Sequence, residues 1–533
     1  MPRLVRSLLT RSSTLRDTMV GIPSKPLATL FLLSRAFGST AARTAAERLH
    51  IGNMNTKVLG ASYAVRGPVL DRALELQHEL SDNPGSLPFD EIVQCNIGNP
   101  QSLGQLPLSF HRQVLSLIMA PELLSDANLP MTSKLFNADT IERAKRYAAS
   151  VPSMGAYTHS QGIHLVREEI KEFIEARDGV GVVDPEQIFL TNGASEGVRI
   201  TMQCMMRQGD NDNDGVLVPI PQYPLYSASC ALMNGALVPY YLAEESGWGL
   251  EIDELKRQLS EAREKGIAVR GLVVINPGNP TGNTLSYENM KDIVEFCVAE
   301  KLVLMADEVY QENIWRPDRP FFSFRKVAVE LGYEDVQGGD LQLISFHSVS
   351  KGFIGECGIR GGYFELFGID DDVKAQMYKL ASISLCSNTP GQVMTGLMVK
   401  PPAEGEESFS QYNEERLSTL ASLKRRADKV ASALDALPGV HCRPSDGALY
   451  AFPRVDLPDK FVKEAEANGM PADEVYCLKL LSATGVVVVP GSGFGQVDGT
   501  WHFRTTFLPP EEKVDGVMER ITAFHNAFMT EYA

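Results

Sequence analysis

Between about residues 135 and 400, short runs of β-branched and other apolar residues alternate with stretches of helical periodicity. The apolar runs are QIFLT, GVLVPI, GALVPYYL, GLVVIN, LVLMADEVY and LQLISFHS. A stretch between them, SEGVRITMQCMMRQ, has apolar residues at helical spacing after a polar start. Strands that alternate with helix-length segments form parallel βαβ units, whose sheet is covered by helices on both faces. The alternation therefore predicts an α/β fold with a mainly parallel sheet.

The remaining sequence predicts further regions, because a chain of 533 residues usually forms more than one domain. The composition changes near 400–412 to PPAEGEESFSQYN, which predicts a loop, and a long periodic helix and a last helix near 511–530 follow. We expect residues 47–134 to form an N-terminal arm and part of a small domain. Residues 135–400 are then the large ligand-binding domain, and residues 401–533 the small C-terminal domain.

Residues 1–46 differ in composition from the rest of the chain. They hold seven Lys and Arg, twelve Ser and Thr and a single acid, Asp17. This composition is typical of a transit peptide and predicts a mitochondrial enzyme, and a disordered cytosolic tail is the alternative. A chloroplast, or a cytosolic form that starts at Met19 or Met54, also stays open. The C-terminal residues Glu-Tyr-Ala do not match a peroxisomal address.

The charge of the chain excludes several classes of protein. The first 46 residues carry a net charge of +6, so that −23 falls on the others and the whole chain has −17. Nucleic-acid binders have a basic excess instead, so no nucleic-acid partner is expected. No apolar run approaches the length of a membrane span, and the eight cysteines form no CxxC pair. These features predict a soluble protein with reduced thiols, no membrane partner and no metal site.

Two motifs at predicted strand ends carry groups that can bind a ligand: one can hold an anion and the other offers a side-chain amide. In open α/β sheets, ligands bind outside the carboxyl ends of the strands. In LTNGASEGV, the turn of Gly193, Ala194 and Ser195 would present backbone N–H groups and a positive helix end to a phosphate, although an ordinary helix cap is the alternative. In NPGNPTG, a rigid loop after the strand GLVVI aims the amide of Asn276 or Asn279 at a ligand.

Two further strand ends carry charged residues. LVLMADEVY ends in Asp307, Glu308 and Tyr310, and a carboxylate there is costly unless it faces a cation or a protonated nitrogen. The alternative is that Asp307 caps a following helix.

The segment SVSKGFIGECGIRGGY gathers Ser348, Ser350, Lys351 and Arg360 beside glycines. A lysine near Arg360 should have a lowered pKa, as a nucleophilic amine requires, and a solvated surface lysine is the alternative. Cys357 in this segment is either redox-sensitive or, more simply, an inert small residue.

Together, these four motifs resemble the fold type I pyridoxal-phosphate enzymes of the aspartate aminotransferase superfamily, from about Asn96 to Leu508. The resemblance implies a large domain with a mainly parallel seven-stranded sheet flanked by helices, a smaller α+β domain, and pyridoxal 5'-phosphate (PLP) as cofactor. It implies that Lys351 bonds covalently to PLP, that Asp307 pairs with the ring nitrogen, and that Tyr310 and Asn279 donate to the ring oxygen.

The resemblance also assigns the remaining contacts to the cofactor. The phosphate would lie on the turn of Gly193, Ala194 and Ser195, and Tyr223 in PIPQYPLYSA would lie over the ring. Tyr157 in GAYTHSQGIHLVREEI would reach the phosphate of a neighbouring subunit, which implies a homodimer with shared active sites. The residues that complete the phosphate site would be Ser348, Ser350 and Arg360.

The same resemblance supplies a substrate site. Arg504 in HFRTTFLPP would bind the α-carboxylate through two hydrogen bonds, a geometry that lysine does not offer. Gly98 in IGNP would be a backbone donor to that carboxylate, and Asn279 would contact the substrate as well.

Four segments look like the alanine-specific subgroup of this superfamily: IGNPQSLGQ, GAYTHSQGIHLVREEI, PIPQYPLYSA and SVSKGFIGECGIRGGY. This similarity implies transfer of the amino group of L-alanine to 2-oxoglutarate, giving pyruvate and L-glutamate by a ping-pong mechanism through pyridoxamine phosphate. The alternatives are a glutamate:glyoxylate aminotransferase, a PLP lyase of the aminocyclopropane-carboxylate synthase type and a non-catalytic regulator.

Overall fold

The structure, a computed structural model, describes residues 48–61, 67–207, 209 and 212–533. The chain forms two separate compact units, Met1–Met54 and Asn55–Ala533, and in the first unit only residues 48–54 are described. The predicted transit segment 1–46 therefore lies outside the described residues. The description below concerns the unit Asn55–Ala533.

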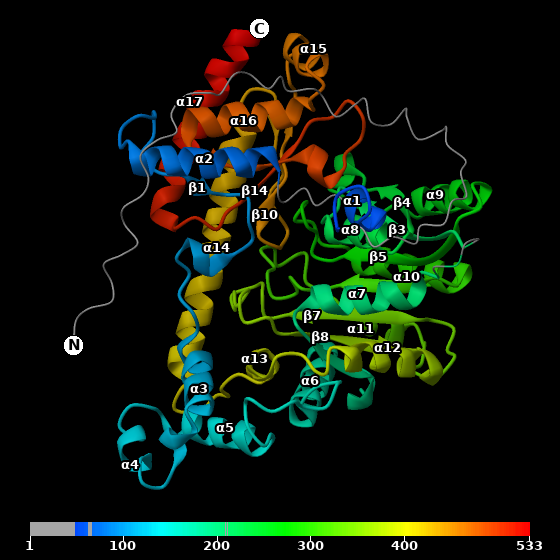
Figure 1. Cartoon of the computed structure of the whole chain (residues 1–533), viewed down its shortest axis with the longest axis vertical. Helices are drawn as coiled ribbons and strands as arrows, with labels where there is room; N and C mark the ends of the chain where they lie inside the picture. The colour runs from blue at the N-terminus through cyan, green and yellow to red at the C-terminus, as the bar shows by residue number, and fades with distance from the viewer. Residues whose placement is uncertain (1–47, 62–66, 208, 210–211) are drawn as a thin grey trace. The chain divides into compact units, whose positions relative to one another are not determined.

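A seven-stranded sheet lies at the centre of this unit (Figure 1). Its strands follow the order β2-β8-β7-β6-β5-β3-β4, and all neighbouring pairs are parallel except those that β8 makes with β2 and β7. The six predicted strands and the mainly parallel sheet are confirmed. Only β8 has no counterpart among the predicted apolar runs. It follows β7 through the loop that contains Lys351, with no helix between the two strands. The strands are β2 (Ile188–Thr191), β3 (Asp214–Ile220), β4 (Ala236–Tyr241), β5 (Ala268–Ile275), β6 (Val303–Asp307), β7 (Leu343–Ser348) and β8 (Gly362–Phe367).

Helices cover both faces of this sheet, because successive residues of a buried strand point to opposite sides. In β5, Leu272 and Val274 join one buried cluster while Val273 joins another. The first cluster includes residues of α9 (Ile252–Glu264), α10 (Tyr287–Glu300) and α11 (Phe324–Glu330). The second includes residues of α7 (Ala194–Met205), α8 (Leu225–Leu232) and α12 (Asp371–Ile383).

Segments from both ends of this unit share another core. Leu76 and Leu80 pack in one buried cluster with Leu480 and Leu481, and Val93 pairs in parallel with Val486. The helices of this region are α2 (Pro68–Asp82), α14 (Phe409–Asp435), α15 (Asp459–Ala467), α16 (Ala472–Thr484) and α17 (Glu511–Tyr532). Its strands are β1 (Val93–Gln94), β9 (Val440–His441), β10 (Tyr450–Ala451), β11 (Arg454–Val455), β12 (Val486–Val487), β13 (Val489–Pro490) and β14 (Phe503–Thr506).

The predicted loop 400–412 is shorter than expected, because α14 already begins at Phe409. The boundaries at residues 134 and 400 stay predictions. The other helices are α1 (Thr56–Gly60), α3 (Ser109–Met119), α4 (Leu129–Thr132), α5 (Ala138–Ala149), α6 (His164–Asp178) and α13 (Thr389–Val399). No helix among the described residues has the length and apolar character that crossing a bilayer requires.

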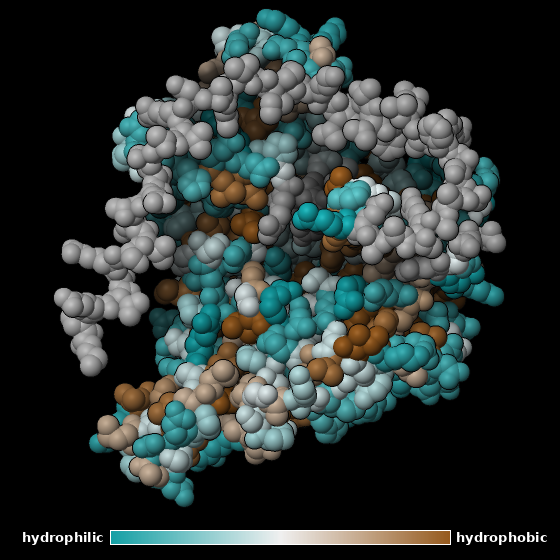
Figure 2. Space-filling model, in the orientation of Figure 1, coloured by the Kyte–Doolittle hydropathy of each residue, from teal (hydrophilic) through white to brown (hydrophobic). Residues whose placement is uncertain are grey.

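Polar residues cover much of the face shown in Figure 2, and hydrophobic residues appear there as separate patches. Met119, Met131 and Leu135, in the segment from α3 to α5, expose 57%, 64% and 75% of their surface. Exposed apolar side chains in one segment are typical of a surface that contacts another chain.

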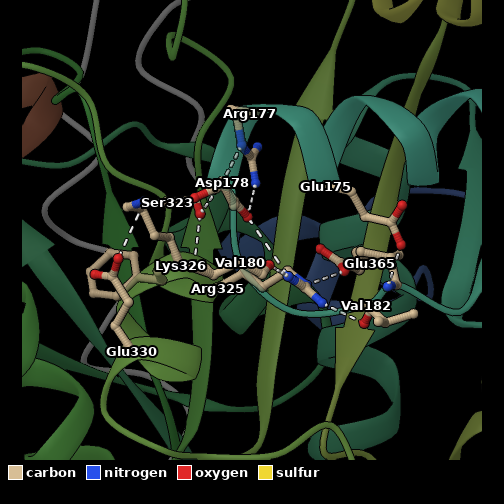
Figure 3. Close-up of polar contacts among 12 residues, drawn as sticks. Glu175, Arg177, Asp178, Val180, Val182, Ser323, Arg325, Lys326, Glu330 and Glu365 are labelled. Atoms are coloured by element: carbon tan, nitrogen blue, oxygen red, sulfur yellow. Dashed lines mark hydrogen bonds and ion pairs between the residues drawn. The ribbon is translucent and has the colours of Figure 1, made fainter.

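A group of charges lies between α6, α11 and β8, in which Asp178, Arg325 and Glu365 are buried and Arg177 is partly exposed (Figure 3). We call Arg177, Asp178, Arg325 and Glu365 the Arg325 cluster. Arg325 donates through Nε to Glu365 at 2.9 Å and through Nη2 to the carbonyl of Val182 at 2.8 Å. Asp178 accepts from Arg177 Nε at 2.7 Å and from the Ser323 hydroxyl at 2.8 Å. The charges of the Arg325 cluster therefore neutralise one another inside the protein.

Candidate active site

A cavity of about 330 Å³ lies at the carboxyl ends of β5, β6 and β7. It is lined by the last residues of these strands, Ile275, Asp307 and Ser348. This position agrees with the expected location of ligands in open α/β sheets. The structure brings the following predicted residues to the cavity: Gly98, Ala194, Ser195, Tyr223, Asn279, Asp307, Tyr310, Ser348, Ser350, Lys351, Arg360 and Arg504.

Two predicted residues do not line this cavity. Gly193 lies directly behind it, and a Cβ atom added there would come within 2.7 Å of Arg360 Nη2. Tyr157 exposes 74% of its surface. Its predicted role concerns a neighbouring subunit and stays a prediction.

Asp307 is almost completely buried at the end of β6. Its Oδ2 accepts a hydrogen bond of 2.8 Å from the Tyr226 hydroxyl, while its buried Oδ1 has no hydrogen-bond partner among the described residues. Burial raises the pKa of this carboxyl to about 6, although the bond from Tyr226 opposes the shift. The alternative role as a helix cap is wrong, because the chain turns after Asp307 and its next helix, α11, begins at Phe324.

Sequence reasoning missed Tyr226, which fixes one oxygen of Asp307. This tyrosine lies in the first turn of α8, in the same segment as the predicted Tyr223. Tyr223 lies before α8, which begins at Leu225, so no helical spacing relates the two tyrosines and the shared segment was the only signal available in the sequence.

Lys351 follows β7 and is half-buried in the wall of the cavity. Its Nζ donates to the carbonyl of Gly98 at 2.8 Å. The alternative of a solvated surface lysine is therefore wrong. Cys357 lines the same wall, and its Sγ donates to the carbonyl of Ser350 at 2.9 Å.

The start of α7 forms one end of the cavity. Gly193 precedes this helix with a φ of 84°, a left-handed conformation that glycine adopts without strain, and no side chain caps the helix there. Arg360 Nη2 lies 3.3 Å from the Ser195 hydroxyl, and the Ser348 hydroxyl donates to the Ser350 hydroxyl at 3.0 Å. A positive helix end, a guanidinium and hydroxyl groups suit a phosphate.

Arg504, in β14, forms the other charged part of the cavity. It is buried, and its Nη1 donates to Asn279 Oδ1 at 3.0 Å and its Nη2 to the carbonyl of Asn96 at 2.5 Å. Its buried Nε has no hydrogen-bond partner among the described residues. The guanidinium lies 4.4 Å from the centre of the Tyr450 ring and 4.6 Å from that of Phe494. The two rings fix the plane of the guanidinium and leave it able to bind a carboxylate.

Tyr450 is a second residue that sequence reasoning missed. Its hydroxyl lies 2.9 Å from the Tyr310 hydroxyl, which in turn lies 3.4 Å from Asn279 Nδ2. A Cβ atom added at Gly98 would come within 2.3 Å of the Tyr450 hydroxyl, so glycine is required for this close approach. No motif around Tyr450 indicated a site, because its contacts come from segments far apart in the sequence.

The cavity therefore combines a phosphate-type site, a carboxylate-type site and the amine of Lys351. The carboxyl of Asp307 lines the same cavity, with one oxygen available for a further donor. This arrangement can bind a phosphorylated ring and an amino acid together.

Comparisons with known proteins agree with this geometry. The family model "Aminotransferase class I and II" matches residues 125–521. A similar curated protein, named alanine aminotransferase 2, mitochondrial, from Arabidopsis thaliana, is 53% identical over 94% of this chain and 92% of its own length. The protein named glutamate–glyoxylate aminotransferase 2 from the same plant is 47% identical over 91% of this chain and 98% of its own length.

Solved structures show the same fold. An aminotransferase from Escherichia coli has a TM-score of 0.68 and is 26% identical, and the match covers 89% of this chain and 98% of that chain. Since the family model and the curated relatives extend over most of the sequence, the chain belongs to the class I and II aminotransferase family.

Proposed function

We propose that this enzyme uses PLP to transfer the amino group of L-alanine to 2-oxoglutarate, giving pyruvate and L-glutamate. The observation that carries the proposal is the meeting of Lys351, the unpartnered Oδ1 of Asp307 and the available edge of Arg504 in one cavity. The substrate assignment is supported by the relative named an alanine aminotransferase, whose identity of 53% exceeds the 47% of the relative named for glyoxylate.

The residues of the cavity fit PLP. The family and the fold are generally PLP-dependent. The buried Oδ1 of Asp307 lacks a donor, and a protonated ring nitrogen would supply that donor. Ser195, Ser348, Ser350, Arg360 and the N–H groups at the start of α7 would hold the phosphate, while Tyr310 and Asn279 would contact the ring oxygen.

When bound, PLP supplies an electron sink that makes the Cα proton of the amino acid acidic. Asp307 would keep the ring nitrogen of the cofactor protonated, because the ionised carboxylate favours a positive charge. At an effective dielectric constant near 20, a charge pair in contact gains about 4 kcal/mol before desolvation, enough to determine the protonation state. Tyr226 holds this carboxylate in one orientation through its hydroxyl.

Lys351 would hold the cofactor in the resting enzyme and act as the base once the substrate has displaced it. Its Nζ would take the proton from the substrate Cα and pass it to the cofactor, and the second half-reaction would run the same transfer in reverse. In the structure this amine lies 2.8 Å from the carbonyl of Gly98, beside the predicted carboxylate site. Because one set of residues would serve both half-reactions, the two substrates would react in turn, as in a ping-pong mechanism.

Arg504 binds the α-carboxylate that the amino acid and the oxo acid share. Asn279 and Asn96 hold two of its nitrogens, and the rings of Tyr450 and Phe494 restrict its rotation. A guanidinium held in one plane loses little entropy when it binds a carboxylate. The N–H group of Gly98 would add a backbone donor to the same carboxylate.

The enzyme works as a homodimer in this proposal, as is typical of the fold. Tyr157, exposed in the single chain, would reach the phosphate bound by a second copy. The exposed apolar residues between α3 and α5 are consistent with burial against another chain.

The enzyme is mitochondrial. The Arabidopsis relative described above is named mitochondrial, and residues 1–46 have the composition of a transit peptide.

The experiment that tests this function is a visible absorption titration of the purified, PLP-loaded protein with L-alanine. The cofactor band should fall as L-alanine is added and return with 2-oxoglutarate or pyruvate. A band that L-alanine leaves unchanged but that glutamate lowers and glyoxylate restores would favour the glyoxylate reaction instead. A protein that shows no band with added PLP would refute the cofactor assignment.

Lys351→Ala is the matched control for the titration. This variant should bind PLP without a covalent bond and lose transfer activity by at least about 1000-fold, because both the nucleophile and the base are removed. Its circular dichroism spectrum should match that of the wild type. Transfer at the wild-type rate would overturn the assignment of Lys351.

A further inference from the structure

We propose that this enzyme has a second small-molecule site, which binds a compact oxyanion carrying two or more negative charges. The site is a cleft of about 430 Å³ that shares no lining residue with the active cavity. Four segments form its walls: 246–249 before α9, 281–289 from the loop after β5 into α10, 316–319 after β6, and 443–446 before β10.

Three arginines face this cleft, in a protein whose net charge is strongly negative. Arg316, Arg319 and Arg443 line it, and Asp446 is the one carboxylate among the lining residues. Guanidinium groups on separate segments would repel one another there unless an anion lies between them. The cleft is therefore a locally positive region of an acidic surface.

The arginines differ in their partners. Arg316 is already paired, with Asp318 at 2.6 Å and Asp446 at 3.6 Å. Arg443 donates to the backbone carbonyl of Glu245 at 2.6 Å, and within the described part of the chain no carboxylate forms an ion pair with it or with Arg319. Their donors are available to a ligand, and guanidinium groups bind phosphate and carboxylate groups through two parallel bonds.

A buried hydroxyl supplies a second, independent observation. Thr284 lines the cleft and is 5% exposed, and its Oγ1 has no hydrogen-bond partner among the described residues. A buried polar atom without a partner is uncommon in native proteins and points to a ligand or an ordered water. The first turn of α10 also lies in the wall through Ser286 and Asn289, and the Ser286 hydroxyl caps this helix by accepting from the backbone N–H of Asn289.

The cleft lies behind the active cavity and shares its supporting segments. Asn279 belongs to the loop that continues into the wall of the cleft at Thr281. Ser445 Oγ donates to the carbonyl of Tyr450 at 2.7 Å, and Gly447 N donates to the carbonyl of Gly282 at 2.8 Å. A ligand that bridges Arg319 and Arg443 would thus join the segment that follows Tyr310 to the segment that precedes Tyr450, and both tyrosines line the active cavity.

The test measures the binding of two probes to the PLP-loaded enzyme by isothermal titration calorimetry. Pyrophosphate stands for a phosphate ligand and citrate for a carboxylate ligand. The probe that binds more tightly shows which of these two groups the cleft prefers. We expect one of them to bind with a stoichiometry of one per chain in the presence of excess pyruvate, an oxo acid assigned to the active cavity that carries only one negative charge. Binding that excess pyruvate abolishes would place the anion in the active cavity and overturn the proposal.

Variants test the residues of the cleft. Arg319→Gln with Arg443→Gln should weaken the binding of the tighter probe at least ten-fold. The matched control is Arg263→Gln, an exposed arginine on α9 outside the cleft, and it should leave the affinity unchanged. Equal affinity in the double variant and the wild type, or no binding of either probe to the wild type, would refute the site. Neither change affects a residue of the active cavity, so the transfer activity without the probe shows that each variant is folded.

Discussion

The active cavity and the Arg325 cluster both bury charged side chains beside the central sheet, but only one of them is complete. In the Arg325 cluster each of the three side-chain nitrogens of Arg325 donates a hydrogen bond, and both oxygens of Asp178 accept (Figure 3). In the cavity, Asp307 Oδ1 and Arg504 Nε are buried and find no partner in the part of the chain that the structure describes. A complete network stabilises the fold, whereas buried groups without partners show where a ligand completes the structure.

The contrast is sharpest between two consecutive residues at the end of β6. Asp307 lines the cavity, while the carboxylate of Glu308 accepts a hydrogen bond of 2.8 Å from the backbone N–H of Phe324 at the start of α11. Successive side chains of a strand point to opposite sides, so two adjacent acids serve different purposes. The first lines the cavity, where the proposed cofactor would bind, and the second fixes the backbone at the start of α11.

The largest effect is expected for Asp307→Asn. Asparagine cannot stabilise a protonated ring nitrogen, and the loss of about 4 kcal/mol corresponds to a rate about 1000-fold lower. The free energy of unfolding of the cofactor-free protein should not fall, because an uncompensated buried carboxyl is removed. Steady-state transfer from L-alanine and urea unfolding measure the two quantities, and near-normal transfer would contradict the role of Asp307.

For Arg325→Met the opposite pattern is expected. The substitution leaves the carboxylates of Asp178 and Glu365 buried with less compensation, which should lower the free energy of unfolding by about 3–5 kcal/mol. The transfer rate of the folded protein should stay within about two-fold of the wild type, because Arg325 does not line the cavity.

Arg72→Met is the control for this change. Arg72 forms an exposed pair with Glu75 at 2.8 Å, so its loss should change the unfolding free energy by about 0.5 kcal/mol or less. Equal stability losses in the two variants would show that the Arg325 cluster contributes no more than a surface pair.

The pH dependence of the cofactor-free protein provides a third test. Burial raises the pKa of Asp307 from its usual 3.8 to about 6, so the folded state binds this proton more tightly than the unfolded chain. The free energy of unfolding should therefore fall by about 2 kcal/mol between pH 4.5 and 7, relative to cofactor-free Asp307→Asn. Urea unfolding of both proteins at the two pH values measures the difference. Bound PLP should remove most of this pH-dependent difference in unfolding free energy. Identical pH profiles of the two proteins without PLP would contradict the unpaired state of Asp307.

The smallest effect is expected for Tyr450→Phe. The variant keeps the ring against Arg504 and loses only the contact with the Tyr310 hydroxyl, a loss of about 1 kcal/mol. We expect kcat/KM for L-alanine to fall by less than about ten-fold, whereas Tyr450→Ala should lower it further because Arg504 loses a ring. Equal effects of the two variants would show that the ring contributes nothing.

The sequence predicted the sheet well because each of the six apolar runs is bounded by helical periodicity. It did not predict β8, whose position beside β7 follows from a direct connection without a helix. The residues that line the cavity came from motifs at strand ends, where parallel strands direct their ends to one edge. Their roles in binding PLP and the substrate stay predictions that the titrations and variants above can test.

Tyr226 and Tyr450 could not be recognised in the same way. Each is an ordinary buried tyrosine in sequence, and only its contact with Asp307 or Tyr310 makes it part of the site. The second cleft is similar, because its arginines lie on segments more than 100 residues apart and have no common motif.

The sequence by itself determined the fold class and the chemical groups of the active site, because strand ends and glycine turns are local properties. Only the tertiary structure decided which of these groups were left without partners. Arg504 reaches the backbone of Asn96 and the amide of Asn279 across hundreds of residues, and Asp307 retains one free oxygen while Glu308 beside it is bonded. Hydrogen-bond satisfaction depends on all the segments that pack around an atom, and no single stretch of sequence contains that information.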